Sequence, residues 1–189
     1  MEHHKEAQQE SPEYLRMSLA AAMTLGFKQG LFYRNTKLYC INLLLTYKAG
    51  CAARCAYCGL SNKRSGKYHE KSFIRVDWPT YRTAEVIERI AGRRQRVKRI
   101  CISQITNKRS IKDTLTLCRQ LRSSFNIPVS LLISPTIVTR QDLNDFKTAG
   151  ADKIGVAIDL ATPALFDQYR GSGVGGPHCW ETYLNRLAQ

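Results

Sequence analysis

The chain has 189 residues, of which 43% are hydrophobic and 23% are charged. These proportions fit a single globular domain, and they exclude a disordered, collagen-like or coiled-coil protein. Lys and Arg outnumber Asp and Glu by 29 to 15, and the net charge of +14 favours acidic partners, phosphates or nucleic acid.

No part of the sequence has the pattern of a targeting or membrane segment. The most apolar early stretch, residues 17–27, is shorter than the roughly 20 residues of a membrane span, and acidic residues precede it. The sequence therefore predicts a small amphipathic helix ending near Gly26, no membrane association and a cytoplasmic location.

Four apolar stretches predict the strands of a sheet. The first, residues 37–47, is nearly continuously apolar, as expected of a parallel strand that is covered on both faces. The other three lie at residues 97–105, 127–134 and 153–159.

Helical patterns follow these strands. Residues 77–80 predict the start of the first helix, Thr139 predicts an N-cap with Asp142 three residues later, and Thr162 predicts the start of a helix before Gly171. Gly150 predicts a helix end. The helical patterns occupy residues 81–94, 111–121, 139–150, 162–171 and 177–187.

Alternating strands and helices are typical of a parallel α/β architecture, either a barrel or an open sheet. A closed eight-stranded barrel needs about 250 residues, which is more than this chain has. We expect about four βα units in a core domain over residues 31–189, after an N-terminal helical extension over residues 1–30. Because the last helix reaches Gln189 without a cap, we expect the chain to be the first part of a longer protein.

Three cysteines lie close together in a long loop after the first strand. Cys51, Cys55 and Cys58 have the spacing C-x3-C-x2-C, and three neighbouring thiolates can converge on one metal centre. The total of seven cysteines is odd, which favours a metal or cluster role over complete disulfide pairing. A zinc ion could take His69 as a fourth ligand, whereas a [4Fe–4S] cluster on three cysteines keeps one iron open for chemistry. Unliganded cysteines are the third alternative.

This motif, with Tyr57 directly before its last cysteine and βα repeats behind it, resembles that of the radical S-adenosylmethionine (radical SAM) superfamily. The resemblance implies a partial (β/α) TIM-like barrel and a [4Fe–4S] cluster on Cys51, Cys55 and Cys58 that chelates SAM. It also implies an external electron donor, whose electron cleaves SAM into methionine and a 5′-deoxyadenosyl radical that abstracts hydrogen from substrate.

The resemblance implies further cofactor contacts. Tyr57 matches an aromatic residue that packs near the adenine of SAM, and Ser103 or Gln104 is the candidate contact for its amino group. Asp159 matches an acidic residue on the SAM ribose, with a helix N-cap as the alternative. Arg170 could bind the SAM carboxylate, or it is simply a cation at a helix C-terminus.

Within the superfamily, the chain resembles the biotin synthase-like branch, specifically the two-protein lipoyl synthase of archaea and some bacteria. The resemblance lies in LYCINLLLTY, CGLSNKR, FIRVDWPTY, RICIS, AGADKIGVAID and GVGGPHCW. It implies sulfur insertion into a protein-bound octanoyl chain, with a second radical SAM protein and an octanoylated carrier protein as partners. One alternative is a radical SAM enzyme that acts on a small metabolite or on RNA, and the basic residues within 63–67 and 89–99 could bind RNA phosphates. The other alternative is a non-catalytic, cluster-binding remnant.

Sulfur insertion needs a sulfur donor, often a second iron–sulfur cluster. Cys40 and Cys101 lie on predicted strands and are its candidate ligands, although a buried free cysteine also packs as a small hydrophobic residue. Cys118 completes the apolar stripe of a helix, and Cys179 is expected on the last helix.

Overall fold

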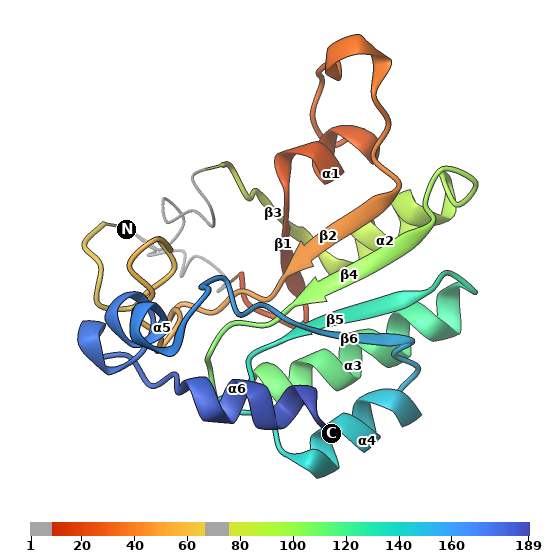
Figure 1. Cartoon of the computed structure of the whole chain (residues 1–189). Coiled ribbons are helices and arrows are strands. Elements are labelled where there is room, and N and C mark those ends of the chain that lie inside the picture. Colours follow the sequence, from red (N-terminus) through yellow and green to blue (C-terminus); the bar gives the residue numbers. More distant parts are fainter. Residues whose placement is uncertain (1–8, 67–75) are drawn as a thin grey trace, which may run out of the picture.

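The computed structural model of the chain describes residues 9–66 and 76–189. They form one six-stranded mixed sheet with the strand order β3-β1-β2-β4-β5-β6 (Figure 1). Its strands are β1 (Tyr14–Met17), β2 (Cys40–Leu44), β3 (Thr80–Arg82), β4 (Arg99–Ser103), β5 (Val129–Ile133) and β6 (Lys153–Val156). The helices are α1 (Leu19–Thr24), η1 (Tyr33–Asn35), α2 (Thr83–Ala91), α3 (Ser110–Ser124), α4 (Arg140–Thr148), α5 (Pro163–Tyr169), η3 (Ser172–Val174) and α6 (Trp180–Leu187).

The four strands predicted from the sequence are confirmed as β2, β4, β5 and β6, which lie side by side and parallel. Helices α2, α3 and α4 lie behind them in Figure 1. Alternate strand residues, such as Ile100 and Ile102, are fully buried on this helix face. We call the opposite side of the parallel strands the open face, and its residues include Arg99 and Cys101, which are partly exposed.

Strands β1 and β3 extend the sheet beyond β2, and the sequence did not predict them. β1 pairs antiparallel with both β2 and β3. The N-terminal segment that was expected to be helical therefore contains a strand as well as α1. The prediction that a helix starts at residues 77–80 is wrong, because residues 80–82 form β3 and α2 begins at Thr83.

The helix ends follow the local capping signals. Thr139 Oγ1 accepts the N–H of Asp142, and the Asp142 carboxylate accepts the N–H of Thr139 at 2.7 Å, so the predicted capping box is confirmed. Gly150, with a φ of +100°, follows the end of α4. Thr162 is the N-cap of α5 and accepts the N–H of Leu165.

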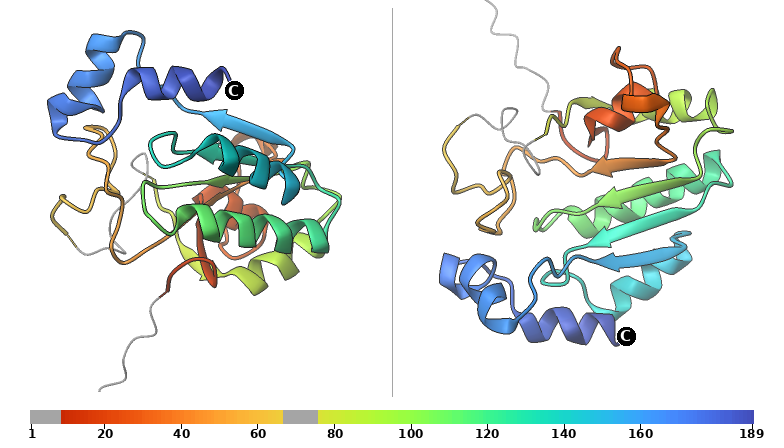
Figure 2. Two further views of the ribbon diagram at one scale, coloured as in Figure 1. Left: turned by 90° about the horizontal axis from the view of Figure 1, so that it is seen from below. Right: turned by 45° about the horizontal axis from the view of Figure 1, so that its top comes forward.

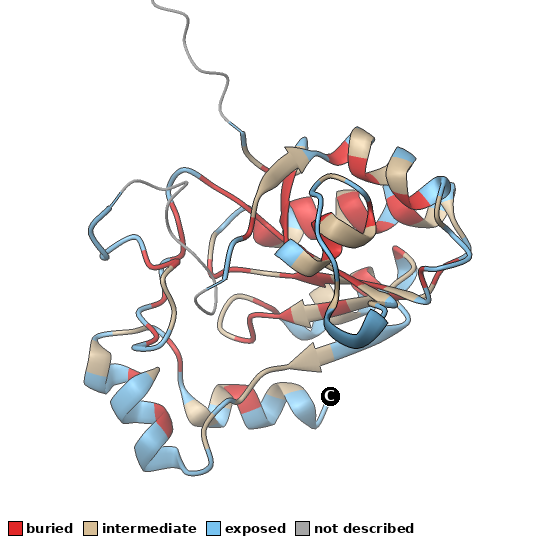
Figure 3. Cartoon of the chain, turned by 90° about the horizontal axis from the view of Figure 1, so that it is seen from above, coloured by how far each residue is buried: buried red, intermediate tan, exposed pale blue. Residues whose placement is uncertain are grey.

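The C-terminal segment places α5 and α6 beside each other. The ring of Phe166 packs edge-to-face on Trp180 and Tyr183, with centroid distances of 5.5 and 5.0 Å. Figure 3 shows that α5 is largely exposed and that α6 mixes exposed and partly buried residues, whereas the buried residues gather along the strands and on the helix surfaces packed against them. In the described part of the chain, no helix is long and apolar enough to cross a bilayer.

Candidate functional site

A cavity of about 450 Å³ lies at the carboxyl ends of the parallel strands. The strand-end residues Leu44, Ser103 and Ile133 line it together with parts of the cysteine loop and residues 157–178. Ligands of α/β proteins usually bind at this end of a parallel sheet. The cavity brings together all eight site residues expected from the sequence: Cys51, Cys55, Tyr57, Cys58, Ser103, Gln104, Asp159 and Arg170.

The backbone of the cysteine loop is held against the strand ends. Gly50 adopts a φ of +69°, a conformation that glycine accepts without strain, and the chain turns there into the motif. The N–H of Cys51 donates to the Leu60 carbonyl at 3.1 Å, and the N–H of Ala52 donates to the Thr106 carbonyl at 2.8 Å. These bonds tie the loop both to itself and to the segment that follows β4.

The thiols of the loop lie in a setting suited to metal binding. The Thr106 N–H donates to Cys51 Sγ at 3.3 Å, which fixes the position of this sulfur atom. Burial raises the pKa of the Cys55 thiol to about 11 against the lowering charge of Arg170, and burial likewise raises the pKa of Cys58. A positively charged metal centre reverses this preference, because thiols deprotonate when they coordinate it.

The donor set of the cavity is three thiols, which are ligands of iron–sulfur clusters and of zinc alike. Across residues 9–66 and 76–189, no three Cys, His, Asp or Glu side chains form a group that could hold one metal ion. In a [4Fe–4S] cluster each cysteine binds a different iron, so its ligands stand farther apart than those of one ion. His69, the fourth ligand of the zinc alternative, lies outside the described residues.

Arg170 connects the cysteine loop to the end of β6. Its Nη1 donates to the Ala157 carbonyl at 2.6 Å and to Tyr57 Oη at 3.2 Å, and it pairs with the Asp159 carboxylate. Its Nη2 donates to Tyr183 Oη at 3.0 Å. The Arg170 side chain is only 11% exposed, and its Nε is buried with no hydrogen-bond partner among the described residues. That donor is therefore unsatisfied among the described residues.

Asp159 joins the same network rather than capping a helix. It adopts a φ of +65°, and its carboxylate accepts from Tyr57 Oη at 2.9 Å. The N-cap alternative is wrong, because Thr162 is the N-cap of α5. Tyr57 and Asp159 are 102 residues apart in the chain, so their contact depends on the fold.

The two candidates for the SAM amino group differ in their surroundings. The Gln104 amide already donates to Thr114 Oγ1 at 3.0 Å and accepts the Ser134 N–H at 3.1 Å. Ser103 is 6% exposed, lines the cavity and makes a side-chain hydrogen bond to Cys101. The hydroxyls of Thr106 and Ser134 are hydrogen-bonded to each other at 2.9 Å.

The sequence did not point to His178, Tyr183 or Thr136. His178 Nδ1 lies 2.6 Å from Thr136 Oγ1 and 3.2 Å from Tyr183 Oη, directly behind Arg170. Burial, assisted by the charge of Arg170, lowers the pKa of His178 to about 4, so its ring is neutral at pH 7. No spacing pattern marks their contact, because Thr136 lies 42 residues before His178 in the chain.

The comparison with known families decides the identity of this site. Residues 46–188 match the model described as the radical SAM superfamily. The chain belongs to the radical SAM superfamily. Radical SAM proteins in general use a [4Fe–4S] cluster and SAM, in agreement with the cysteine motif. A search of the curated proteins finds no match to the sequence.

The remaining cysteines of this radical SAM chain occupy different environments. Cys40 and Cys101 lie on the open face of β2 and β4. Cys118 is fully buried in the core, as predicted. Cys179 is exposed and directly precedes α6 as its N-cap residue, rather than lying within the helix.

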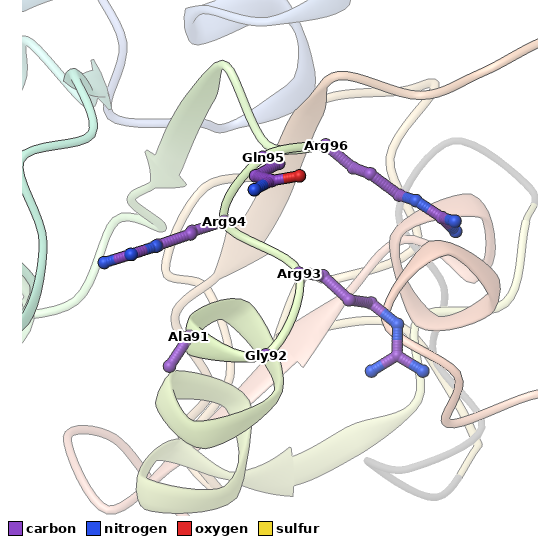
Figure 4. Close-up of a pocket in the computed structure, with 6 residues that line it drawn as sticks. All are labelled: Ala91, Gly92, Arg93, Arg94, Gln95 and Arg96. Atoms are coloured by element: carbon purple, nitrogen blue, oxygen red, sulfur yellow. The ribbon is translucent and has the colours of Figure 1, made fainter.

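A second hollow, of about 630 Å³, lies in the connection between α2 and β4 (Figure 4). It is at the amino end of β4, the end opposite the cysteine loop. The side chains of Arg93, Arg94 and Arg96 point in different directions in Figure 4, so they do not converge on one small anion. This hollow is a basic surface remote from the chemistry of the cysteine motif.

Proposed function

We propose that this chain binds one [4Fe–4S] cluster through Cys51, Cys55 and Cys58 and cleaves SAM reductively. The observation that carries the proposal is that Cys51, Cys55 and Cys58 line one cavity together with the cationic side chain of Arg170. Its volume of about 450 Å³ is within the ordinary range for small-molecule sites. We take the parallel strands to be part of a TIM-like (β/α) barrel of the radical SAM type.

When bound, the reduced cluster supplies one electron to the sulfonium of SAM, which separates into methionine and a 5′-deoxyadenosyl radical. The residues of the chain bind and orient SAM for this step. Arg170 binds the SAM carboxylate through its positive charge, while Asp159 accepts from a ribose hydroxyl. Ser103 contacts the amino group in preference to Gln104, because both ends of the Gln104 amide are already hydrogen-bonded.

Tyr57 has two tasks in this proposal. Its ring is 44% exposed and lines the cavity, so it can pack against adenine. Its hydroxyl donates to Asp159 and accepts from Arg170, which sets the positions of both charged groups. Tyr57→Phe separates the two tasks, because it keeps the ring and removes the hydroxyl.

Anaerobic iron–sulfur reconstitution tests the cluster. We expect wild-type protein to take up iron and gain absorption in the visible range, and the Cys51→Ala/Cys55→Ala/Cys58→Ala variant to do neither. Cys179→Ala is the matched control, since this exposed thiol is remote from the motif in sequence and is not a lining residue of the cavity. Unchanged iron and absorption in the triple variant refute the proposal, and zinc bound without iron favours a structural metal site.

SAM cleavage is tested by measuring 5′-deoxyadenosine after adding SAM and a chemical reductant, which replaces the external electron donor. Formation of 5′-deoxyadenosine by wild type, but not by the triple cysteine variant, supports an enzyme. A chain that carries the cluster but forms no 5′-deoxyadenosine is the cluster-binding remnant instead.

Sulfur insertion of the lipoyl synthase type is the reaction we propose from the sequence resemblance. The position of Cys40 and Cys101 on one face of neighbouring strands supports it, because they could contribute ligands to a second cluster. The assay uses an octanoylated carrier peptide, with and without a second radical SAM protein. Lower iron per chain in Cys40→Ala/Cys101→Ala supports the second cluster, and unchanged iron contradicts it.

A further inference from the structure

The register of the sheet arranges the open face in rows. Cys101 lies between Asn42 on β2 and Ser130 on β5, and Ser130 is next to Lys153 on β6. We call these four residues the middle row. The row above it, toward the cavity, consists of Leu44, Ser103, Leu132 and Gly155, and the row below it begins with Cys40 and Arg99.

Arg99 reaches from the lower row into the middle row. Its Nη1 donates to Ser130 Oγ at 2.6 Å, on the neighbouring strand. Lys153 is the strand neighbour of Ser130 on its other side. The Ser130 hydroxyl therefore lies between two basic positions, and it carries no charge that could neutralise them.

No acidic residue occupies the open-face positions of β2, β4, β5 and β6. Among the described residues, neither Arg99 nor Lys153 takes part in an ion pair. A lysine on an edge strand can serve to block unwanted strand pairing, which accounts for Lys153 alone. Arg99 lies on β4, an interior strand, where that role does not apply.

We propose that Arg99, Ser130 and Lys153 bind an anionic group of the substrate, a carboxylate or a phosphate, on the open face. The inference rests on the proposed function, because it takes the cavity above this face as the place of SAM cleavage. A guanidinium and a hydroxyl already in contact form a preorganised donor pair for such an anion, and Lys153 adds a point charge.

The rows also set the length of the substrate. Rows on one face are two residues apart, which is roughly 6.6 Å. The upper row lines the cavity through Leu44, Ser103 and Leu132. The anionic group therefore binds one to two rows, on the order of 7–13 Å, from the cavity end of the strands. The carbon atom that loses hydrogen therefore lies at the cavity, remote from the anionic group of the substrate. The part of the substrate between that carbon and the anionic group is polar.

The polar side chains of the middle row favour an anionic substrate over the octanoyl substrate proposed above from the sequence resemblance, so the two substrates are alternatives for the same proposed SAM cleavage. The middle row presents an amide, a thiol, a hydroxyl and an ammonium group. An octanoyl chain lying along this face would remove water from these groups without replacing their hydrogen bonds. An anionic, hydrogen-bonding substrate satisfies them.

The test is calorimetric titration of anaerobically reconstituted protein with glutarate and with inorganic phosphate, and with neutral glutaramide as the uncharged comparison. We expect one of the two anions to bind and glutaramide not to bind. Lys153→Gln, at an exposed position that tolerates substitution, and Arg99→Gln should each weaken that binding by at least about tenfold. Arg119→Gln removes an exposed charge from α3 and is the matched control, which should bind as wild type does.

Absence of anion binding to wild type, or equal binding by Lys153→Gln and Arg119→Gln, overturns the inference. If Arg99→Gln does not fold, Ser130→Ala tests the same contact and should also weaken binding. Production of 5′-deoxyadenosine by wild type is measured on the same preparation. Cleavage without selective anion binding refutes the substrate inference alone, whereas selective anion binding without cleavage refutes only the proposed function.

Discussion

Replacing Arg170 is expected to destabilise the protein far more than neutralising its partner Asp159. Arg170 is 11% exposed, whereas the Asp159 side chain is 40% exposed and can be hydrated when its partner is lost. Arg170→Met keeps an unbranched apolar stem but removes the donors to the Ala157 carbonyl and the Tyr183 hydroxyl. Hydrogen bonds that involve a charged group contribute about 1.5–3 kcal/mol each, so we expect a loss of about 3–5 kcal/mol in the free energy of unfolding.

Asp159→Asn is the matched comparison. Asparagine still accepts from Tyr57 and from Arg170, and solvent at the 40% exposed Asp159 side chain screens the charge that is lost, so the ion pair itself contributes about 1 kcal/mol or less. We therefore expect a loss of about 1 kcal/mol or less. Arg170→Lys keeps the charge but lacks the two-nitrogen geometry that reaches Ala157 and Tyr183, so its loss should be intermediate.

The free energy of unfolding is measured by urea denaturation followed by circular dichroism, under reducing conditions. The Arg170→Met/Asp159→Asn double variant completes the cycle, and its coupling energy reports the direct interaction of the two groups. Equal losses for Arg170→Met and Asp159→Asn would refute the account of Arg170 as the structural link between the cysteine loop and the end of β6.

Two further predictions concern pH and the cysteine loop. The pKa of His178 is lowered to about 4 in the folded protein, from an ordinary value of 6.5. Between these two pH values the unfolded protein binds a proton that the folded protein does not. The free energy of unfolding should therefore fall by about 3 kcal/mol as the pH drops from about 6.5 to 4. His178→Gln should remove this part of the slope in urea titrations at several pH values, and an unchanged slope contradicts the assignment. Gly50→Ala should cost about 1–2 kcal/mol and lower iron uptake, because φ is +69° and the new Cβ would lie 3.3 Å from the Leu60 carbonyl oxygen. Gly92→Ala is the control, since its φ is −66° and its Cβ would lie 3.8 Å from the Glu88 carbonyl oxygen, an ordinary contact distance. An equal loss of iron in both variants contradicts the prediction.

The parallel part of the fold could be predicted because its signals are local. Each of the strands β2, β4 and β5 carries several apolar residues within a few positions, and alternate ones such as Ile100 and Ile102 are buried against the helices. Thr139 and Gly150 bound α4 through contacts within a few residues. Cys118 follows a helical period and is buried, as that period predicts.

Strands β1 and β3 could not be found in the same way. Their residues are short stretches whose hydrogen bonds are made to each other across more than 60 residues, in pairs such as Leu15 with Tyr81. The local signal at residues 77–80 indicated a helix start, and sheet pairing overrode it. The strands fan across the molecule in the right-hand view of Figure 2, with β6 on the side opposite β2.

The sequence by itself determined the βα series, the position of the cysteine motif after the first parallel strand, and the resemblance to radical SAM proteins. The tertiary structure alone decided which polar groups meet at that motif. Arg170 contacts Tyr57 across 113 residues, and Arg99 contacts Ser130 across 31, through strand register rather than local spacing. Periodicity and capping act between near neighbours, whereas these contacts exist only after the strands have aligned.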